Sequence, residues 1–461
     1  MAPVQALWID NEDVRSAIEF PVINGQSGKT VHTANGATPE LAIAAVESAQ
    51  RAFGPWSKTS PWERRKLLQS AARILHNRRQ EISELIKLET PAPDFMVEEI
   101  NINNGIALFE ELAAQVTNMT NGMLPHCCES SRMAFVVKQP YGVQLGIAPW
   151  NASLFLALRS VITPISCGNT AILKASELSP GVHHFIGRLL KEAGFPRGSQ
   201  IAEALISHPA VRKVNFTGST AVGKIIAAKA AEYAKPCILE LGGKAPLIVF
   251  DDADLTQAAK AAVMGAFVHH GQICMGTDTV LVHKSVAEEL IARLSVEAPR
   301  IPRSWAVSDQ QAIKTEALVE DAINKGGRLA YGKLERNGSS LHPTILTGVK
   351  PSMRLYWEES FGPTLAVLAF ETEDEAVALA NGHEYGLSAS VFTKNVARGI
   401  RIARRIDSGS VHVNSMTVHD EVQLPHGGTK SSGWGRFGVP WAFDEFLQIK
   451  TITITDSDLG E

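Results

Sequence analysis

The stretch Glu240-Leu241-Gly242-Gly243-Lys244 stands at the start of a second α/β unit. It follows the apolar run Cys237 to Leu239 and precedes a predicted strand, Ala245 to Phe250. Its two glycines carry no side chain, so the backbone can approach a ligand closely beside an acid and a base. The sequence therefore predicts a ligand-binding stretch where one unit ends and the next begins.

Strand and helix signals alternate on both sides of this stretch. Before it, Ser179 and Pro180 open a predicted helix that ends at Gly194. After it, Asp254 caps a helix that we expect from about Leu255 to His270. Strands are predicted at Thr170 to Lys174, Val211 to Phe216, Thr279 to His283, Thr364 to Phe370 and Ser388 to Phe392. This alternation predicts parallel sheets covered by helices.

The first part of the chain carries helix signals and one strand pair. Thr38 before Pro39, and the capping box that starts at Ser60, predict two long helices. Pro91 and Pro93 move the start of the next helix, which we expect from about Asp94 to Val116. Arg132 to Ala148 reads as a strand, a turn and a strand.

Composition places the chain among ordinary globular proteins. Its 461 residues are enough for two or three domains, and 45% hydrophobic and 20% charged content with a net charge of −4 gives no nucleic-acid surface. The longest apolar run, Ala152 to Leu173, is interrupted by Arg159 and Pro164, so no membrane segment is predicted. No secretory signal is visible, and the five cysteines form neither a disulfide framework nor a zinc pattern, which favours a reducing cytoplasm.

Gly271-Gln272-Ile273-Cys274 offers a single thiol just past a predicted helix. A cysteine attacks as the thiolate, so we expect a helix end, a cation or a base to lower its pKa. The alternative is a simply buried cysteine. One reaction would use this thiol together with Glu240 and Asn151. The thiolate adds to an aldehyde, the amide of Asn151 stabilises the oxyanion, hydride leaves to a nicotinamide, and the carboxylate of Glu240 activates the water that releases the acid.

The ordered motifs of this sequence resemble those of the NAD(P)-dependent aldehyde dehydrogenases, over about Pro39 to Lys450. The motifs are Pro149-Trp150-Asn151, Phe216-Thr217-Gly218-Ser219-Thr220, Glu240-Leu241-Gly242-Gly243-Lys244, Gly271-Gln272-Ile273-Cys274 and Glu359-Ser360-Phe361-Gly362-Pro363. Pro425-His426-Gly427-Gly428 and Ser432-Gly433-Trp434-Gly435-Arg436-Phe437-Gly438 look closest to the salicylaldehyde and vanillin dehydrogenase branch.

The resemblance implies an α/β fold with a Rossmann-type cofactor domain, an α/β catalytic domain and a β oligomerisation arm. We assign residues 1–121 and 141–241 to the NAD-binding domain, 242–446 to the catalytic domain, and 122–140 with 447–461 to the arm. A sheet edge offered by such an arm pairs with another subunit, so we expect a homodimer or homotetramer.

The resemblance also implies catalytic roles. Cys274 is the nucleophile, Asn151 and the Cys274 backbone N–H stabilise the oxyanion, and Glu240 is the general base. Burial after an apolar run is expected to raise the pKa of Glu240 and make it a better base. A second glutamate that some members carry is replaced here by Phe437.

For the cofactor, the glycine-rich turn with Gly218, Ser219 and Gly223 opens a helix whose N-terminus suits a pyrophosphate. Lys174 and Glu177 would hold the adenosine ribose; because a carboxylate repels a 2′-phosphate, NAD is preferred, with NADP possible. The full implied set is Ile147, Ala148, Trp150, Lys174, Ser176, Glu177, Gly218, Ser219, Gly223, Leu241, Glu359 and Phe361. No metal site is predicted, because the paired histidines diverge on a helix.

Ala152, Leu156 and Arg159 fall on one face of a predicted helix and form the expected aldehyde pocket. A small residue and a cation there suit an aromatic aldehyde with a hydroxyl or carboxyl group. The alternatives are that Arg159 pairs with a structural carboxylate, or that it binds the carboxylate of a semialdehyde.

An inactive NAD-binding or assembly protein is a further alternative, because two regions look shortened relative to the family. Near Gly198, Ile201 to Ile206 is helical in pattern, so two helices follow each other without a strand. Near Arg303, the region Pro299 to Gln311 is short as well.

Overall fold

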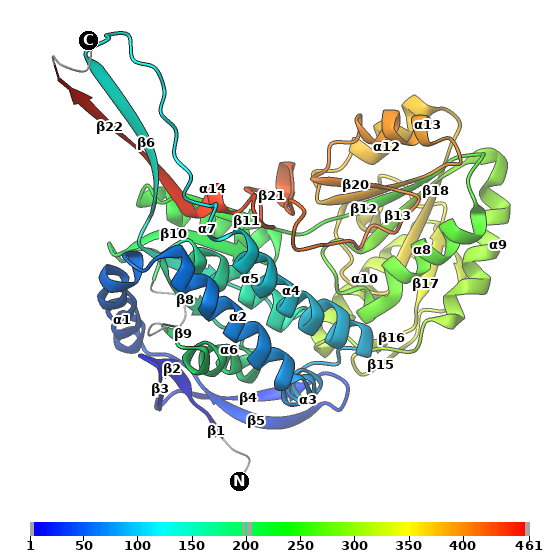
Figure 1. The fold of residues 1–461 in the computed structure, drawn as a ribbon. Coiled ribbons are helices and arrows are strands. Elements are labelled where there is room, and N and C mark those ends of the chain that lie inside the picture. Colours follow the sequence, from blue (N-terminus) through cyan, green and yellow to red (C-terminus); the bar gives the residue numbers. More distant parts are fainter. Residues whose placement is uncertain (1–3, 196–198, 201–204, 457–461) are drawn as a thin grey trace.

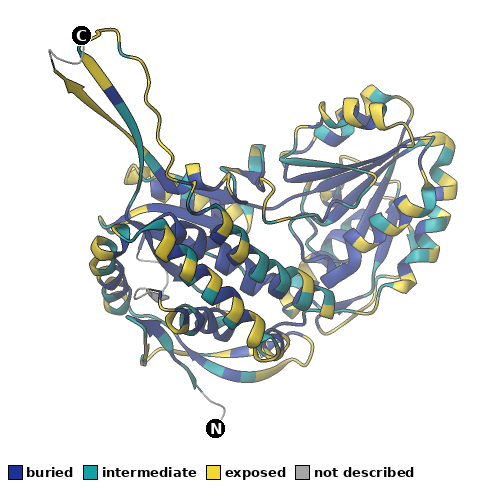
Figure 2. Cartoon of the chain, in the orientation of Figure 1, coloured by how far each residue is buried: buried dark blue, intermediate teal, exposed yellow. Residues whose placement is uncertain are grey.

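The structure is a computed structural model that describes residues 4–195, 199–200 and 205–456. Two α/β lobes lie side by side, and a two-stranded arm projects from one of them (Figure 1). Figure 2 shows that the central strands of both large sheets are buried, whereas the outer helices and the arm carry many exposed and intermediate residues. Two layers of helices around a sheet therefore enclose each core, as the alternating pattern predicts.

The first lobe is built on a six-stranded sheet in the order β21-β11-β10-β7-β8-β9. All pairs are parallel except β21 with β11. The strands are β7 (Val143–Ile147), β8 (Thr170–Lys174), β9 (Ser199–Gln200), β10 (Val211–Thr217), β11 (Cys237–Glu240) and β21 (Gly433–Trp434). The predicted strands at 170–174 and 211–216 are confirmed.

Strand β9 corrects the expectation that no strand stands between the two helices there. It pairs with β8 through Ile172 and Leu173. Two residues are too few to produce an alternating pattern, so the sequence does not reveal it. The helix predicted at 201–206 falls largely on residues 201–204, which lie outside the described residues, while Leu205 and Ile206 are in a turn and a bend.

Helices cover both faces of this sheet, and one of them, α5, is buried along its whole length. The set is α1 (Pro39–Ser57), α2 (Pro61–Asn77), α3 (Arg79–Glu89), η1 (Met96–Asn103), α4 (Asn104–Gln115), α5 (Ser153–Ser166), α6 (Pro180–Ala193) and α7 (Thr220–Glu232). The caps at Thr38 and Ser60 are confirmed. The expected helix from about Asp94 is confirmed too, although η1 is wound as a π-helix.

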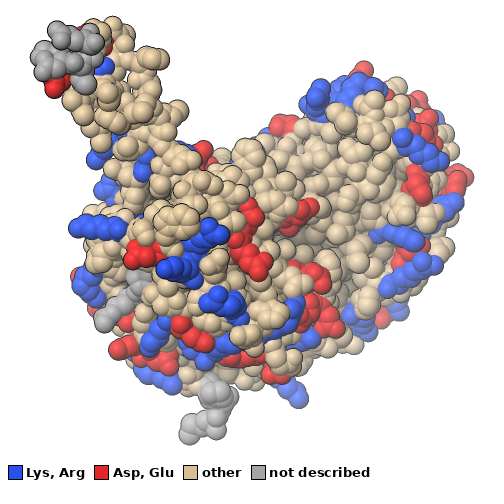
Figure 3. Space-filling model, viewed as in Figure 1, with Lys and Arg blue, Asp and Glu red and all other residues tan. Residues whose placement is uncertain are grey.

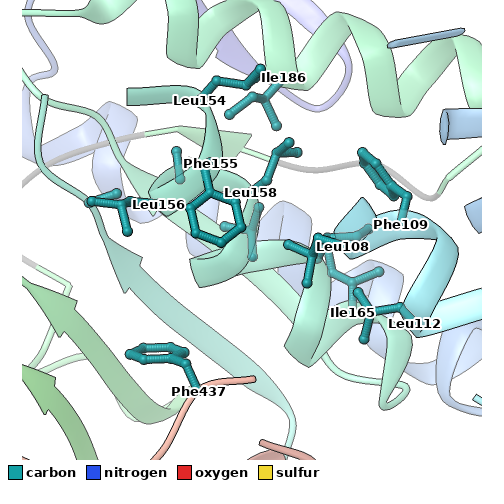
Figure 4. Close-up of a cluster of buried hydrophobic side chains, with 14 of the residues drawn as sticks. Leu108, Phe109, Leu112, Leu154, Phe155, Leu156, Leu158, Ile165, Ile186 and Phe437 are labelled. Carbon is teal, nitrogen blue, oxygen red and sulfur yellow. The ribbon is translucent and has the colours of Figure 1, made fainter. Parts of the chain in front are cut away.

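The core of this lobe forms where α4, α5 and α6 meet. Figure 4 shows Phe109 of α4, Leu158 of α5 and Ile186 of α6 pointing toward one another. Phe437, from the far end of the chain, packs into the same cluster. The apolar spacing of each helix therefore converges on α5, which explains why this helix tolerates only a few polar side chains.

The start of α6 differs from its prediction. Ser179 occupies the cap position but its side chain makes no capping bond. Instead the fully buried Glu89 accepts the N–H groups of Gly181 at 2.7 Å and Val182 at 3.0 Å. A carboxylate satisfies these donors and the positive end of the helix better than a hydroxyl does. The capping role predicted for Ser179 is therefore wrong.

The second lobe contains a seven-stranded sheet in the order β14-β17-β18-β13-β12-β19-β20, parallel except for β14. Its strands are β12 (Ala245–Val249), β13 (Thr277–His283), β14 (Arg328–Tyr331), β17 (Thr344–Thr347), β18 (Thr364–Phe370), β19 (Ser388–Phe392) and β20 (Ser410–Val413). Its helices are α8 (Leu255–Phe267), α9 (Ala287–Glu297), α10 (Asp309–Asn324), α12 (Glu373–Asn381) and α13 (Val396–Ala403). The predicted cap at Asp254 is confirmed.

Helix α8 ends three residues before the predicted His270. A short turn, η2 (Val268–Gly271), follows it, with φ of 54° at His269 and 59° at His270. Left-handed residues cannot continue a right-handed helix. The chain therefore turns sharply just before Cys274.

The arm pairs β6 (Arg132–Pro140) with β22 (Leu447–Thr455) in an antiparallel ladder. Met133, Ile449, Ile452 and Ile454 on it are exposed. Figure 3 shows that the visible face of the arm carries few charged side chains, in contrast to the two lobes. Among the described residues, every helix is too short or too polar to cross a membrane.

The remaining elements are short. They are β1 (Val4–Gln5), β2 (Leu7–Ile9), β3 (Glu12–Val14), β4 (Glu19–Asn24), β5 (Lys29–Asn35), β15 (Arg336–Asn337), β16 (Ser340–Leu341), η3 (Lys284–Val286), η4 (Ala298–Arg300), α11 (Arg354–Trp357), η5 (Lys430–Ser432) and α14 (Phe443–Phe446).

Candidate active site

A cavity of about 450 Å³ lies at the carboxyl edge of the six-stranded sheet, where the two lobes meet. Open parallel sheets bind ligands at this edge, because the loops that follow neighbouring strands converge there. Asn151 follows β7, Glu240 ends β11, and Cys274 follows the η2 turn. All three side chains line the cavity.

The thiol of Cys274 donates a hydrogen bond to Oε1 of Glu240 at 3.2 Å. The amide Nδ2 of Asn151 donates to the carbonyl oxygen of Gln272 at 3.0 Å, which ties it to the segment that carries Cys274. Gln272 is itself fixed, because its Oε1 accepts the N–H of Val307 at 2.8 Å. The three residues that the sequence selected are therefore held together on one rigid wall.

Glu240 is 1% exposed and its electrostatic setting differs from the prediction. Burial raises the pKa of Glu240, but the positive charge of Arg159, and after it His426, outweighs burial and lowers the pKa to about 2. The expected rise is therefore wrong. The sequence shows that the carboxyl follows an apolar run, but it does not show which cation lies beside it.

That cation is Arg159, whose guanidinium forms ion pairs with Glu240 and, at 2.9 Å, with Asp420. It also lies over the ring of Phe437, with its central carbon 4.6 Å from the ring centroid. A buried cation needs such partners. Of the two alternatives for Arg159, pairing with a structural carboxylate is what the structure has, and the expectation of a free cation facing the aldehyde is wrong.

The thiol of Cys274 has its pKa raised well above its usual range, first by burial and then by the charge of Glu240 and the hydrogen bond to it. The expectation of a lowered pKa is therefore wrong for this arrangement of the site. The thiol is held protonated, with a carboxylate as the nearest acceptor. Forming the thiolate requires moving the proton onto Glu240 or beyond.

The rest of the cavity runs from Cys274 to the start of α7. It is lined by seven further residues selected from the sequence, namely Trp150, Leu156, Gly218, Ser219, Leu241, Glu359 and Phe361. Burial raises the pKa of Glu359 to about 7, and its Oε1 accepts the Gly243 N–H at 2.9 Å. The rings of Trp150 and Phe361 meet edge to face with centroids 6.2 Å apart.

Gly223 and Ala152 were selected but do not line this cavity. Gly223 packs against Leu241, and a Cβ on Gly223 would lie 2.3 Å from Cδ2 of that leucine. Close helix-to-strand packing is therefore its role in the fold. Ala152 is buried at the cap position of α5.

Five selected residues lie along the same sheet edge but outside the cavity. Ile147 and Lys174 end β7 and β8, and Ala148, Ser176 and Glu177 follow those strands. The Glu177 side chain is 65% exposed and lies 3.5 Å from Nζ of Lys174. The edge thus continues from an enclosed end, beside Cys274, to an open end with the exposed carboxylate of Glu177.

The aldehyde dehydrogenase family model matches residues 8–452 of this chain. The chain belongs to the aldehyde dehydrogenase family. This aldehyde dehydrogenase is 43% identical to a vanillin dehydrogenase of Pseudomonas fluorescens, with 95% of each chain covered. It is 39% identical to a salicylaldehyde dehydrogenase of Pseudomonas putida, with 97% and 96% covered.

Solved structures agree. A salicylaldehyde dehydrogenase from Pseudomonas putida G7, complexed with salicylaldehyde, superposes with a TM-score of 0.95 at 36% identity and 98% coverage of both chains. A betaine aldehyde dehydrogenase from Staphylococcus aureus in complex with NAD+ gives 0.93 at 31% identity, with 98% and 95% covered. The fold is that of the family, and the enzyme is an NAD(P)-dependent dehydrogenase of aldehydes.

Sequence reasoning missed several residues of this aldehyde dehydrogenase site. Leu178, Val307, Ser308, Gln310, Gln311 and Lys314 also line the cavity. Four of them lie at or in the first turns of α10, whose cap, Ser308, accepts the N–H of Gln311. The pattern of a serine before an acidic first turn was available as a signal in the region that looked shortened. The contacts of His426 with Glu240 and of Asp420 with Arg159 were also missed, because no sequence pattern near these residues indicates such distant partners.

In the described part of the chain, no group of three His, Cys, Asp or Glu side chains could hold a metal ion. The cavity suits an organic cofactor. The helix N-terminus capped by Ser219 fits the phosphates of a dinucleotide, the ring of Trp150 fits one of its rings, and the open edge with Glu177 fits a ribose.

Proposed function

We propose that this chain oxidises an aromatic aldehyde to the carboxylic acid with NAD as the electron acceptor, through a covalent intermediate on Cys274. The observation that carries this proposal is the convergence of the Cys274 thiol, the Glu240 carboxylate and the Asn151 amide on one enclosed cavity. Such a group set serves acyl transfer through a thiohemiacetal and a thioester.

In the first step Glu240 draws the proton from Cys274, and the thiolate adds to the aldehyde carbon. One N–H of the Asn151 amide is bound to the Gln272 carbonyl. The amide has a second N–H, which is left to stabilise the oxyanion, together with the backbone N–H of Cys274. Preorganised donors of this kind lower the barrier because they need no reorientation when the charge develops.

NAD, when bound, would supply the hydride acceptor that oxidises the substrate carbon. Trp150, Phe361 and Glu359 would enclose its reactive end, and Gly218 and Ser219 its phosphates. Glu177 would bind ribose hydroxyls and disfavour a 2′-phosphate, which supports NAD over NADP. In the last step Glu240 activates a water molecule that releases the acid from Cys274.

An aromatic substrate is supported by the names of the relatives, which are vanillin and salicylaldehyde dehydrogenases. Leu156 and Trp150 supply apolar lining for a ring. A semialdehyde is not favoured, because the guanidinium of Arg159 is committed to Glu240 and Asp420 and has no role left as a carboxylate anchor.

The assembly is part of the proposal. Residues 1–121 with 141–241 would form the NAD-binding domain, 242–446 the catalytic domain, and 122–140 with 447–461 the arm. The exposed isoleucines of β22 support pairing of this arm with another subunit in a homodimer or homotetramer. The free cysteines support a reducing cytoplasm as the location.

The test is NADH formation by the purified chain with a panel of benzaldehydes and with succinate semialdehyde. We expect the benzaldehydes to have the higher kcat/KM, and Cys274→Ala to abolish turnover while NAD still protects the chain from thermal unfolding. Cys237→Ala, on the neighbouring strand β11, is the matched control and should stay active. Turnover by Cys274→Ala would refute the assignment.

A further inference from the structure

Behind the cavity, Glu240 belongs to a buried group of titratable side chains, and the reaction above gives no role to the other members, Arg159, Asp420 and His426. Its Oε2 faces Arg159, whereas its Oε1 has two neighbours at the same distance. The Cys274 thiol lies 3.2 Å from Oε1 on the cavity side, and Nε2 of His426 lies 3.2 Å from it on the other side. Nδ1 of His426 lies 3.7 Å from Oδ1 of Asp420.

We propose that His426, which lies between Glu240 and Asp420, is a proton-relay residue that accepts from Glu240 the proton that Glu240 takes from Cys274. The inference rests on the proposed function. The S–H bond of Cys274 breaks, the proton passes through Oε1 of Glu240, and an N–H bond forms at Nε2 of His426. A thiolate and an imidazolium result, Glu240 is again a carboxylate, and no electrons change hands between the groups.

Glu240 needs such a partner because Arg159 strongly favours its charged form. Burial alone would raise the pKa of Glu240, but the charge of Arg159, followed by that of His426, outweighs burial and holds the pKa at about 2. A carboxylate of that basicity holds a thiol proton only briefly. An imidazole beside it is the stronger base and can keep the proton while the thiolate reacts.

His426 is well placed to hold the resulting charge. The residue is 6% exposed, and it lies between the carboxylates of Glu240 and Asp420. Burial lowers the pKa of His426, but Asp420 and then Glu240 outweigh it, so that the pKa lies above the usual 6.5. Nε2 of His426 is buried and makes no hydrogen bond in this arrangement, so a neutral ring with its proton on Nδ1 has a lone pair on Nε2 that is able to accept a proton from Glu240.

The backbone at His426 is fixed by a two-way bridge to Phe437. The N–H of His426 donates to the Phe437 carbonyl at 3.0 Å, and the N–H of Phe437 donates to the His426 carbonyl at 2.7 Å. The ring of Phe437 lies under Arg159. One rigid bridge therefore positions both groups that contact the two oxygens of Glu240.

The other titratable neighbours do not replace His426. Arg159 opposes its protonation, and the Cys274 thiol faces it only through Glu240. His412 on β20 has its pKa lowered to about 4, by burial and then by His419 and His426, so it stays neutral near pH 7. His419 is turned to Glu421, at 2.8 Å.

The relay predicts the pH dependence of thiol reactivity in the full chain without cofactor. We would measure alkylation of Cys274 by iodoacetamide from about pH 5.5 to 9.5, with mass spectrometry to follow the Cys274 peptide. In the wild type, the alkylation rate of Cys274 should rise with pH in two steps. The first rise is expected above about pH 6.5, because His426 then loses its proton and becomes able to accept the proton of the thiol; the second is expected at high pH.

His426→Gln keeps a polar side chain of similar length that does not titrate. We expect it to lack the first rise and to alkylate at below roughly one tenth of the wild-type rate near pH 8, because the thiol must then lose its proton to solvent. His412→Gln, the matched control, should keep both rises. Two rises in His426→Gln, or one rise in the wild type, would overturn the proposal.

Asp420→Asn tests the relay if His426→Gln does not fold. Removing this carboxylate takes away a group that raises the pKa of His426, so the first rise should move to lower pH; an unmoved or upward-shifted rise would overturn the proposal. Aldehyde turnover is assayed separately. If the wild type oxidises no aldehyde but its alkylation rate still rises in two steps, the proposed function alone is refuted. If the wild type oxidises aldehydes but its alkylation rate depends on pH in the same way as that of His426→Gln, the relay alone is refuted.

Discussion

Replacing Arg159 by methionine removes the guanidinium that bridges Glu240 and Asp420 and leaves an apolar side chain of similar length. The guanidinium is 3% exposed and lies between Phe437 and Phe155, at 4.6 and 5.3 Å from the ring centroids. A methionine can fill this space, so the main loss is electrostatic. We expect Arg159→Met to lower the free energy of unfolding.

The magnitude follows from the proton affinity of Glu240. Lowering its pKa from 4.5 to about 2 corresponds to roughly 3 kcal/mol in favour of the charged, folded form, at about 1.4 kcal/mol for each tenfold change. Removing one partner of a buried ion pair costs about 3 to 5 kcal/mol, because the other charge remains unpaired. We therefore expect a loss of about 3 to 5 kcal/mol near pH 8.

The loss should shrink in acid. In the wild type, the contribution of Glu240 is complete above pH 4.5 and disappears only as the pH falls through about 2. In Arg159→Met, burial is no longer outweighed by Arg159, so the pKa of Glu240 rises and the carboxyl takes up a proton at higher pH. The penalty of an unpaired charge is then relieved as the pH falls.

Urea unfolding, followed by tryptophan fluorescence at one protein concentration, measures this difference at about pH 8 and about pH 5. Arg159→Lys, which keeps the charge, is the control and should lose less. A loss below about 1 kcal/mol for Arg159→Met, or an equal loss at both pH values, would show that the ion pairs do not stabilise the fold as argued.

Four further outcomes are expected. Cys274→Ala should form no NADH in a spectrophotometric assay, and detectable turnover would contradict its role. Glu89→Gln should lower the free energy of unfolding, measured in urea, by about 1 to 3 kcal/mol, because two N–H groups at the start of α6 lose a charged acceptor. Glu84→Gln, at an exposed position, is the control and should change little. Ile452→Asp should reduce the mass seen by light scattering, since it charges the exposed arm; an unchanged mass would contradict the arm as an interface. Glu177→Ser should raise kcat/KM for NADP relative to NAD by about tenfold, and an unchanged ratio would contradict its ribose contact.

Elements with strong local signals could be predicted from the sequence. The capping box at Ser60 and the cap at Asp254 are physical interactions within a few residues, so they appear in the sequence as they do in the structure. The convergence of Cys274, Glu240 and Asn151 was implied by ordered motifs rather than by any local rule. They meet because strands β7 and β11 lie in one sheet and end at the same edge, where the loop that carries Cys274 also lies.

Features that depend on distant partners could not be predicted. The capping of α6 by Glu89 joins residues 92 apart, and the pairing of Arg159 with Asp420 joins residues 261 apart. The same limit explains the wrong direction for the pKa of Glu240. Burial can be inferred from apolar neighbours in the sequence, but the sign of the net pKa shift depends on Arg159, a cation that comes from helix α5.

The pairing of β6 with β22 has a consequence for how the protein is made. Lys138 on β6 and Asp444, just before β22, are separated by 306 residues, and β21 reaches back to the edge of the six-stranded sheet from the same late segment. At about 5 to 20 residues per second, a ribosome needs on the order of 15 to 60 s to supply those last strands. During that interval the nascent chain presents an unpaired β6 and an open sheet edge, which is when chaperones would have most to protect.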